Sequence, residues 1–213
     1  MEIKVNGSWI IKHILKLGED IKGTQQWQYL NQGAKFQTRD IYKELMKHHP
    51  LVEWRGLVYK NKARPRAVFV LWLACQHRLA TKDRLAKFGV NVDQHCVFCG
   101  CIETVQHLFF DCMYTSKVWG EVLGWLCIQH SIQEWNKELQ WLIKICKSRN
   151  WRKHFVKIAV AETVYAVWMD RNARVFRNEM QDKNIVNSII ERITNRIWVY
   201  PKYRDRLAHL LLA

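Results

Sequence analysis

The chain has few residues that break helices: its 213 residues include only 9 Gly and 3 Pro. Apolar residues recur at helical spacing between these breakers, which favours a largely helical protein. No stretch reaches the roughly 20 consecutive apolar residues that a membrane-spanning helix needs. The first 20 residues carry Glu2 and further charges within their apolar stretch, unlike a secretory signal. We therefore expect no membrane association and no secretory leader.

Acidic residues are also scarce, with 19 Asp and Glu against 34 Lys and Arg, which gives a net charge of +15. Such a surplus indicates either a self-repelling soluble surface or an anionic partner, most often nucleic acid. The sequence contains no Asp-Asp pair, although a polymerase needs clustered carboxylates for its metal ions. Because hydrophobic residues make up 49% and include 11 Trp, a sizeable core is expected.

Seven cysteines is an odd number, and four of them crowd into the segment "CVFCGCIETVQHLFFDC", residues 96–112. This pattern is typical of a reducing compartment and a metal site rather than a disulfide framework. The spacing C-x2-C-x7-H-x4-C predicts one structural zinc, because thiolate and imidazole are its preferred ligands. The predicted ligands are Cys96, Cys99, His107 and Cys112. Cys101 could replace Cys99, His95 could replace His107, or all could be ordinary core residues.

The two C-terminal ligands lie five residues apart, about 140° around an ideal α-helix. His107 and Cys112 cannot share one face of such a helix, so the chain should leave the helix before Cys112. Gly100 should ease the tight turn that follows the first cysteine pair. Glu103 is expected either to orient the imidazole or to cap the short helix that carries His107.

Helical spacing and breakers predict a mostly α fold in which a small zinc-stapled (CCHC) module sits within a helical domain and is followed by a helical tail. The expected divisions are a helical approach segment (1–63), the zinc module (64–126) and a C-terminal helical region (127–213). The expected helices are 8–18 capped by Ser8, 38–48, 66–78, 81–88 capped by Thr81 and ended by Gly89, 118–126, 135–145, 155–176, and 182–198 capped by Asp182. Residues 24–37 should be extended or loop.

The segment "RPRAVFVLWLACQHRLATKDRLAKFGVNVDQHCVFCGCIETVQHLFFDC" resembles the zinc-binding domain of plant non-LTR (LINE-type) retrotransposon reverse transcriptases. The matching residues are Pro65, Arg66, Phe69, Trp72, Leu73, Arg78, Leu79, Thr81, Arg84, Leu85, Gly89, Cys96, Cys99, Glu103, His107, Leu108, Phe109, Cys112 and Trp119. Ala80 and Met113 stand where that family commonly has proline. The resemblance covers roughly residues 8–178, most sharply 64–125, and implies zinc at the four predicted ligands.

The resemblance also implies a domain that grips template RNA or target DNA. Basic residues frame the zinc module, and phosphate contacts need such cations. The predicted nucleic-acid contacts are Lys60, Lys62, Arg64, Arg66, Arg78, Lys82, Arg84 and Lys87, with Phe98 as an exposed stacking residue. These charges could equally form a solvated face, and Arg78 or Arg84 could pair with Asp83, Glu103 or Asp111.

Two further basic regions are visible, and two tryptophans are expected in the core. Residues 147–157 form a second basic patch around Trp151, and Arg171, Arg174 and Arg177 share one helical face that meets either solvent or phosphate. Trp72 and Trp119 lie in apolar helical stripes and should be buried.

Three function classes follow. The first is a non-catalytic, zinc-stabilised module that binds RNA or DNA, working in the nucleus or alternatively in the cytoplasm. The second is a domesticated protein-interaction module that uses the C-terminal helices 155–176 and 182–198. A zinc hydrolase is disfavoured, because catalytic zinc keeps an open position beside three protein ligands.

Overall fold

The computed structural model describes residues 9–23, 27–28, 39, 50–179 and 184–211. The chain divides into two compact units, Met1–Leu51 and Val52–Ala213. In the first unit, α1 (Trp9–Lys22) starts directly after Ser8 and extends four residues past the predicted end. The predicted cap Ser8 lies outside the described residues, as does most of the predicted helix 38–48. Most of residues 24–37 also lies outside them, but the described residues 27–28 are helical rather than extended or loop.

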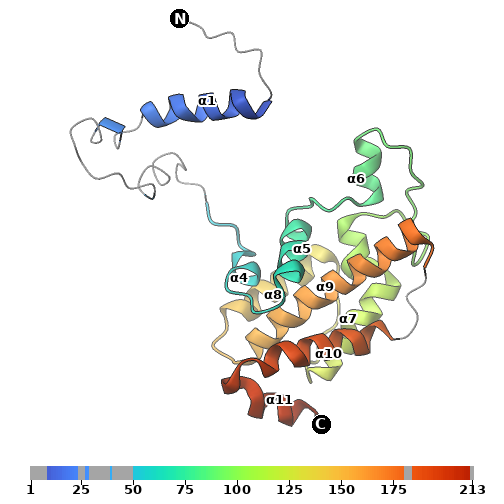
Figure 1. The fold of residues 1–213 in the computed structure, drawn as a ribbon. Helices are drawn as coiled ribbons and strands as arrows, with labels where there is room; N and C mark the ends of the chain where they lie inside the picture. The colour runs from blue at the N-terminus through green and yellow to red at the C-terminus, as the bar shows by residue number, and fades with distance from the viewer. Residues whose placement is uncertain (1–8, 24–26, 29–38, 40–49, 180–183, 212–213) are drawn as a thin grey trace, which may run out of the picture. The chain divides into compact units, whose positions relative to one another are not determined.

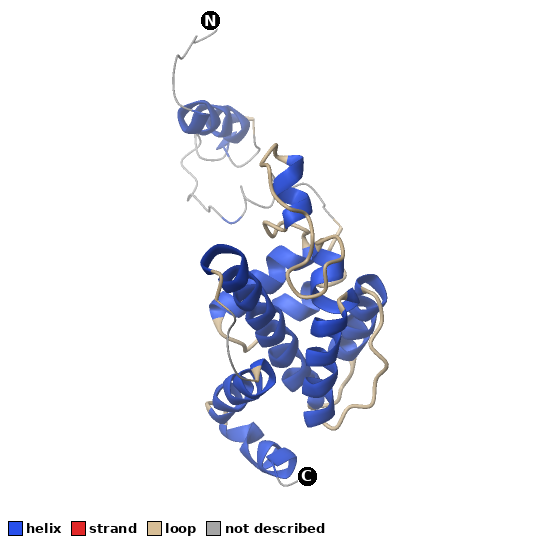
Figure 2. Cartoon of the chain, turned by 90° about the vertical axis from the view of Figure 1, so that its right-hand side faces the viewer, coloured by secondary structure: helices blue, strands red, loops and turns tan. Residues whose placement is uncertain are grey.

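The second unit is built from helices joined by loops (Figures 1 and 2). They are α4 (Arg55–Val58), α5 (Pro65–Cys75), α6 (Lys82–Lys87), the π-helix η1 (His107–Asp111), α7 (Met113–Trp125), α8 (Trp135–Lys147), α9 (Arg152–Arg177), α10 (Ile185–Trp198), the 3₁₀ turn η2 (Pro201–Tyr203) and α11 (Arg204–Leu211). The described residues contain no β-strand, only an isolated antiparallel bridge between His95 and Ile102. The mostly α expectation is confirmed.

The longest helix, α9, is the centre of this unit and contacts α5, α7, α8 and α10 (Figure 1). Ten consecutive residues, 155–164, are buried, which is the behaviour of a helix covered on all sides. Helices α5 and α7 pack against α9, so elements on the two sides of residues 126/127 lie in one compact unit. The compact units divide after Leu51, and the expected domain divisions at 63/64 and 126/127 stay predictions.

Four ionised side chains of α9 are buried, and each has a partner. The partners are the Tyr59 carbonyl for Lys157, Arg64 for Glu162, Arg174 for Asp170 and Glu103 for Arg171. A charge inside a protein is tolerated only when it is paired or hydrogen-bonded. The Glu162 and Arg171 pairs fix α9 against the start of α5 and against the segment that carries the predicted zinc ligands, whereas the Asp170–Arg174 pair lies within α9.

The helices predicted from apolar periodicity are present, while several of their ends and caps differ from the prediction. α5 ends at Cys75, three residues earlier than predicted. The cap of α10 is Asn184, which accepts a hydrogen bond from the Asn187 N–H, and the predicted cap Asp182 lies outside the described residues. Trp119 is fully buried as predicted, but Trp72 is only half-buried and stacks on the exposed Phe69.

Within the described segments, no helix has both the length and the apolar character needed to cross a membrane.

Candidate metal centre

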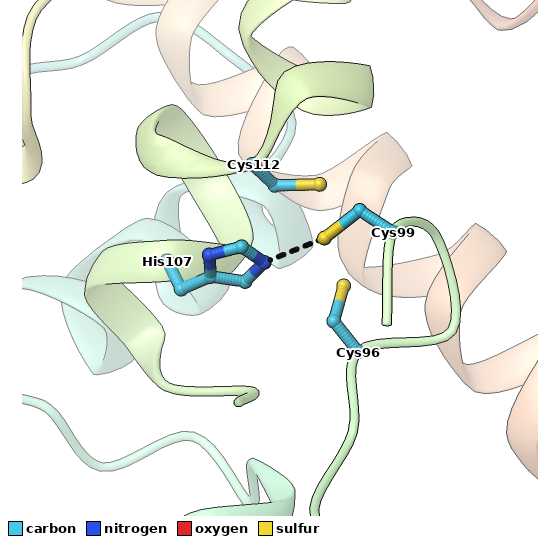
Figure 3. Close-up of side chains that lie close together, drawn as sticks. All are labelled: Cys96, Cys99, His107 and Cys112. Carbon is cyan, nitrogen blue, oxygen red and sulfur yellow. Dashed lines mark hydrogen bonds between the residues drawn. The ribbon is translucent and has the colours of Figure 1, made fainter. Parts of the chain in front are cut away.

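Four side chains from two segments converge on one point (Figure 3). Cys96 and Cys99 come from a loop, while His107 and Cys112 stand at the two ends of the π-helix η1. Their ligand atoms, three Sγ and one imidazole nitrogen, all lie within 4.8 Å of one another. These are the four residues that the spacing predicts as zinc ligands.

The loop is a tight turn closed by backbone hydrogen bonds. The Gly100 N–H donates to the Cys96 carbonyl at 2.9 Å, and the Cys96 N–H donates to the Cys101 carbonyl at 2.6 Å. Gly100 adopts a φ of +79°, which glycine reaches without the steric cost of a side chain. The predicted role of Gly100 is thus confirmed, and the turn brings both thiols to the same side.

The second half of the site differs from the expected α-helix. In η1 the Cys112 N–H donates to the His107 carbonyl at 2.8 Å, a hydrogen bond that spans five residues. This i→i+5 bond defines a π-turn, and such turns are often found at functional sites. The helix ends at Asp111, so the chain leaves it before Cys112 as predicted, and the i→i+5 bond brings Cys112 to the same side as His107. Only Cys112 itself turns to extended backbone, with a ψ of 130°.

The donor set fits a tetrahedral zinc ion. Zinc bonds of about 2.0–2.3 Å at tetrahedral angles place neighbouring donors about 3.5–3.8 Å apart. Cys99 Sγ lies 3.1 Å from His107 Nε2, and the widest separation of 4.8 Å needs only small side-chain rotations to close on a metal. Three thiolates and one imidazole complete a four-coordinate set, so the chain carries a site for one structural zinc.

The two alternative ligands lie outside this cluster. Cys101 is exposed and is not among the four grouped donors. The His95 ring turns to Asp93, with Nδ1 2.5 Å from Oδ1. The alternatives in which Cys101 or His95 replaces a ligand are therefore not supported.

Without a metal, the neighbouring thiols do not all lose their protons together, because one thiol is a hydrogen-bond donor to the thiolate of another. Hydrogen bonding from Cys96 lowers the pKa of Cys112 to about 4. The same hydrogen bond, together with burial, raises the pKa of Cys96, and burial raises the pKa of Cys99. A divalent cation removes this constraint, because metal ligation keeps every cysteine as a thiolate.

Glu103, between the two ligand pairs, ties the metal centre to the helical body. Its carboxylate and the Arg171 guanidinium of α9 are both fully buried, and Arg171 Nη2 donates to Oε1 at 2.6 Å. The same oxygen accepts the Lys82 N–H at 2.8 Å and so caps α6. Glu103 thus caps α6 rather than the helix that carries His107, and the Thr81 hydroxyl, predicted to be the cap of α6, donates to Asp83 instead.

Three predicted surface residues have internal partners. Lys82 is 8% exposed, and its ammonium donates to the His95 carbonyl at 2.7 Å. Arg64 forms a two-pronged ion pair with the buried Glu162, with contacts down to 2.5 Å. Phe98 stacks on Tyr114 with ring centres 4.7 Å apart, and Arg174 lies 4.8 Å from its ring. Protein groups thus already engage Lys82 and Phe98, and their predicted contacts with phosphate and with an unpaired base stay predictions.

The other predicted cations keep their charge at the surface. Lys60, Arg66, Arg78 and Lys87 are exposed, while Lys62 and Arg84 are half-buried. Lys87 makes only a surface ion pair with Asp83 at 3.4 Å, which contributes little. Arg84 donates to the His77 carbonyl. Neither Arg84 nor Arg78 takes the carboxylate partners considered from the sequence, because Glu103 pairs with Arg171 and Asp111 caps α8 through the Trp135 N–H.

The arginine face expected on α9 does not exist as an open surface. Arg171 is buried, Arg174 pairs with Asp170, and only Arg177 is exposed, beside Glu179. Sequence reasoning missed the roles of Arg171 and Asp111. A signal for the first was present, because arginine at a position otherwise apolar at helical spacing implies a buried carboxylate partner.

Residues 36–119 match the family model described as zinc-binding in reverse transcriptase. The matched segment includes all four donors, α5, α6 and η1, and it ends within α7. This confirms a reverse-transcriptase-type zinc-binding domain at the place where the geometry puts the metal centre. Neither the curated proteins nor the solved structures contain a match to this chain.

Proposed function

We propose that the chain is a non-catalytic nucleic-acid-binding module whose fold is stabilised by one zinc ion. The main support for this proposal is a closed Cys3His cluster inside a segment that matches a reverse-transcriptase zinc-binding family. The net charge of +15 supports an anionic partner. On this proposal the partner is the RNA template or DNA target of a LINE-type retroelement of plant origin, and the chain works in the nucleus.

The chemistry of the donor set supports a structural role for the metal. Zinc bound to three thiolates and an imidazole supplies folding free energy, whereas catalytic zinc uses three protein ligands and an open position. Here the fourth ligand position is taken by protein. The sequence also has no Asp-Asp pair for polymerase metals. We therefore expect no metal-dependent nucleotide incorporation or nuclease turnover from the purified chain.

The cations left at the surface support binding to phosphates. Lys60 and Arg66 flank the start of α5, and Arg78 and Lys87 flank α6; all four are exposed. Within the described segments only Lys87 among them has an ion pair with an acid. Such cations can release counterions from a phosphate backbone, which makes the affinity depend on salt.

A second candidate function is protein interaction, which one observation favours. Val58, Ala63, Pro65, Val68, Phe69 and Trp72 line an open apolar groove of about 430 Å³. Phe69 in this groove is 57% exposed. The surface first considered for a protein partner is less suitable, because the apolar stripe of α10 packs inward with Ile189, Ile193 and Ile197 fully buried. Capture experiments with and without nuclease separate the two functions, since a nucleic-acid module loses its partners on nuclease treatment.

The salt dependence of binding tests the proposal. We expect the zinc-loaded protein to bind single-stranded RNA or DNA with little sequence preference, and more weakly as salt rises. Replacing Lys60 and Arg66 together by glutamine removes two exposed cations without breaking an ion pair, so the log–log salt slope should flatten by about 1.4, or about 0.7 per lost contact. Fluorescence anisotropy from 50 to 300 mM salt measures this slope. Failure of the folded wild-type protein to bind either polymer at low salt contradicts the proposal.

A further inference from the structure

We propose that single-stranded nucleic acid binds on a surface remote in sequence from the metal ligands, where Lys62, Lys153, His154 and Lys202 gather around Tyr200 and Tyr203. We call it the Lys62–Lys202 surface. It joins three segments: the approach to α5, the first turn of α9, and η2 after α10. The inference rests on the proposed function and assigns it a binding surface.

Aromatic rings hold two of the cations in place. Lys62 Nζ lies 3.9 Å from the Tyr200 ring centre and 5.1 Å from that of Tyr203. Lys202 Nζ lies 4.9 Å from the Tyr203 ring centre, on the same buried tyrosine. Arg196 donates to the Lys62 carbonyl at 2.5 Å and fixes the backbone there. Cation–π contacts of this kind orient ammonium groups that would otherwise move freely, so the surface is pre-organised for an anion.

Residues at the start of α9 add further positive charge to the surface. The His154 ring lies 5.4 Å from the Tyr203 ring. Its neighbours Lys153 and Lys157 donate to the carbonyls of Ser148 and Tyr59. The first turn of α9 contains no acidic residue, although the positive end of a helix dipole ordinarily attracts one. The helix end and its lysines therefore add to one positive field.

No acid compensates this field within the described residues. Lys62, Lys153, Lys157 and Lys202 form no ion pair with a carboxylate there, and their partners are carbonyls and rings. Residues 196–210 contain a single acid, Asp205. An uncompensated cluster of this kind costs stability through like-charge repulsion. A bound polyanion removes that cost, which gives the cluster a physical reason to bind one.

Repulsion from neighbouring lysines contributes, after burial, to lowered pKa values of Lys62 and His154. Burial and the neighbouring Lys202 lower the pKa of Lys62. Burial, followed by Lys153, Lys62, Lys202 and Lys157, lowers the pKa of His154. A phosphate placed among these groups favours their charged forms.

The extent of the surface favours a polymer over a single phosphate. Beyond Lys202, Arg206 lies 5.3 Å from the Trp151 ring centre, and Arg204 lies 5.4 Å from that of Trp198. Trp198 is 54% exposed and so offers a face for an unpaired base. Cations interleaved with aromatic rings form the usual platform for single strands, in which the cations follow the backbone and the rings stack on bases.

The test compares two double variants of equal charge in the zinc-loaded protein. Lys62→Gln with Lys202→Gln removes two cations of the surface. Lys144→Gln with Lys147→Gln removes two exposed cations from the end of α8. With a single-stranded oligonucleotide, the first variant should flatten the log–log salt slope by about 1.4, whereas the second should leave it unchanged. Zinc content and helicity are checked first, and Lys202→Gln alone, at an exposed position, should flatten the slope by about 0.7 if the double variant does not fold.

Each outcome decides the proposal. Equal flattening in both double variants overturns the assigned surface but leaves the proposed function standing. Absence of wild-type binding removes both. In a competition arm, inorganic phosphate at the same total phosphate concentration should displace little oligonucleotide. Full displacement by inorganic phosphate identifies a free-phosphate site and overturns the assignment to a nucleic-acid backbone.

Discussion

Chelating the zinc should release residues 80–112 from their native structure and destabilise the whole Val52–Ala213 unit. Two thiols, Cys96 and Cys112, are buried beside each other. Without a metal, only the hydrogen bond between them remains. A structural zinc contributes on the order of 10 kcal/mol in small zinc-binding folds. That is comparable to the roughly 5–15 kcal/mol of free energy that stabilises a typical domain.

The release should be local at first, because residues 89–95, between α6 and the first ligand Cys96, add no buried side chain to the core. The described residues 89–95 are all exposed or half-buried. Hydrogen exchange after chelation should therefore rise first at residues 80–112, while amides in the buried middle of α9 exchange last. Adding zinc back should restore protection. Unchanged exchange in residues 80–112 after full removal of zinc contradicts this prediction.

A matched pair of cysteine variants separates loss of metal from loss of any thiol. Cys99→Ser removes a ligand, whereas Cys101→Ser removes an exposed thiol two residues away that lies outside the donor cluster. We expect the first to lose zinc and melt at a clearly lower temperature. The second should keep one zinc per chain and the wild-type melting temperature.

The second large effect is expected at the ion pair between Glu103 and Arg171. Both side chains are fully buried, and Glu103 also caps α6. Glu103→Gln leaves the Arg171 charge in the core without its counter-charge. Breaking a buried pair in this way typically costs about 3–5 kcal/mol. Urea unfolding of the zinc-saturated protein measures the loss.

Two further variants serve as controls for this prediction. Arg177→Gln breaks the exposed pair with Glu179, so it should cost less than about 1 kcal/mol. The double variant Glu103→Leu with Arg171→Met removes both charges, and it should cost clearly less than the two single changes added together. Additive losses in the double variant contradict the view that the pair is coupled.

Strong local patterns allowed the metal ligands and the main helices to be predicted from the sequence. Ile189, Ile193 and Ile197 repeat at helical spacing and are all fully buried in α10. Cysteine and histidine spacing identified the donor set because a small metal site is built from residues close in sequence. In both cases the information is local, and a single sequence carries it.

The roles of charged residues could not be predicted, because their partners lie far along the chain. Arg64 pairs with a residue 98 positions away, and Arg171 pairs with one 68 positions away. Sequence reasoning counts such residues as surface charge, since arginine is almost never fully buried unless paired. The π-turn was not predicted for another reason: the spacing of His107 and Cys112 was interpreted with the geometry of an α-helix.

Zinc K-edge X-ray absorption on the protein purified with one equivalent of zinc tests the ligand set most directly. We expect three sulfur ligands at about 2.3 Å and one nitrogen at about 2.0 Å, because Cys96, Cys99, Cys112 and His107 converge. A spectrum of four sulfurs places Cys101 in the site and contradicts the assignment of His107. An oxygen ligand in place of one protein donor reveals an open position and contradicts the structural, non-catalytic role.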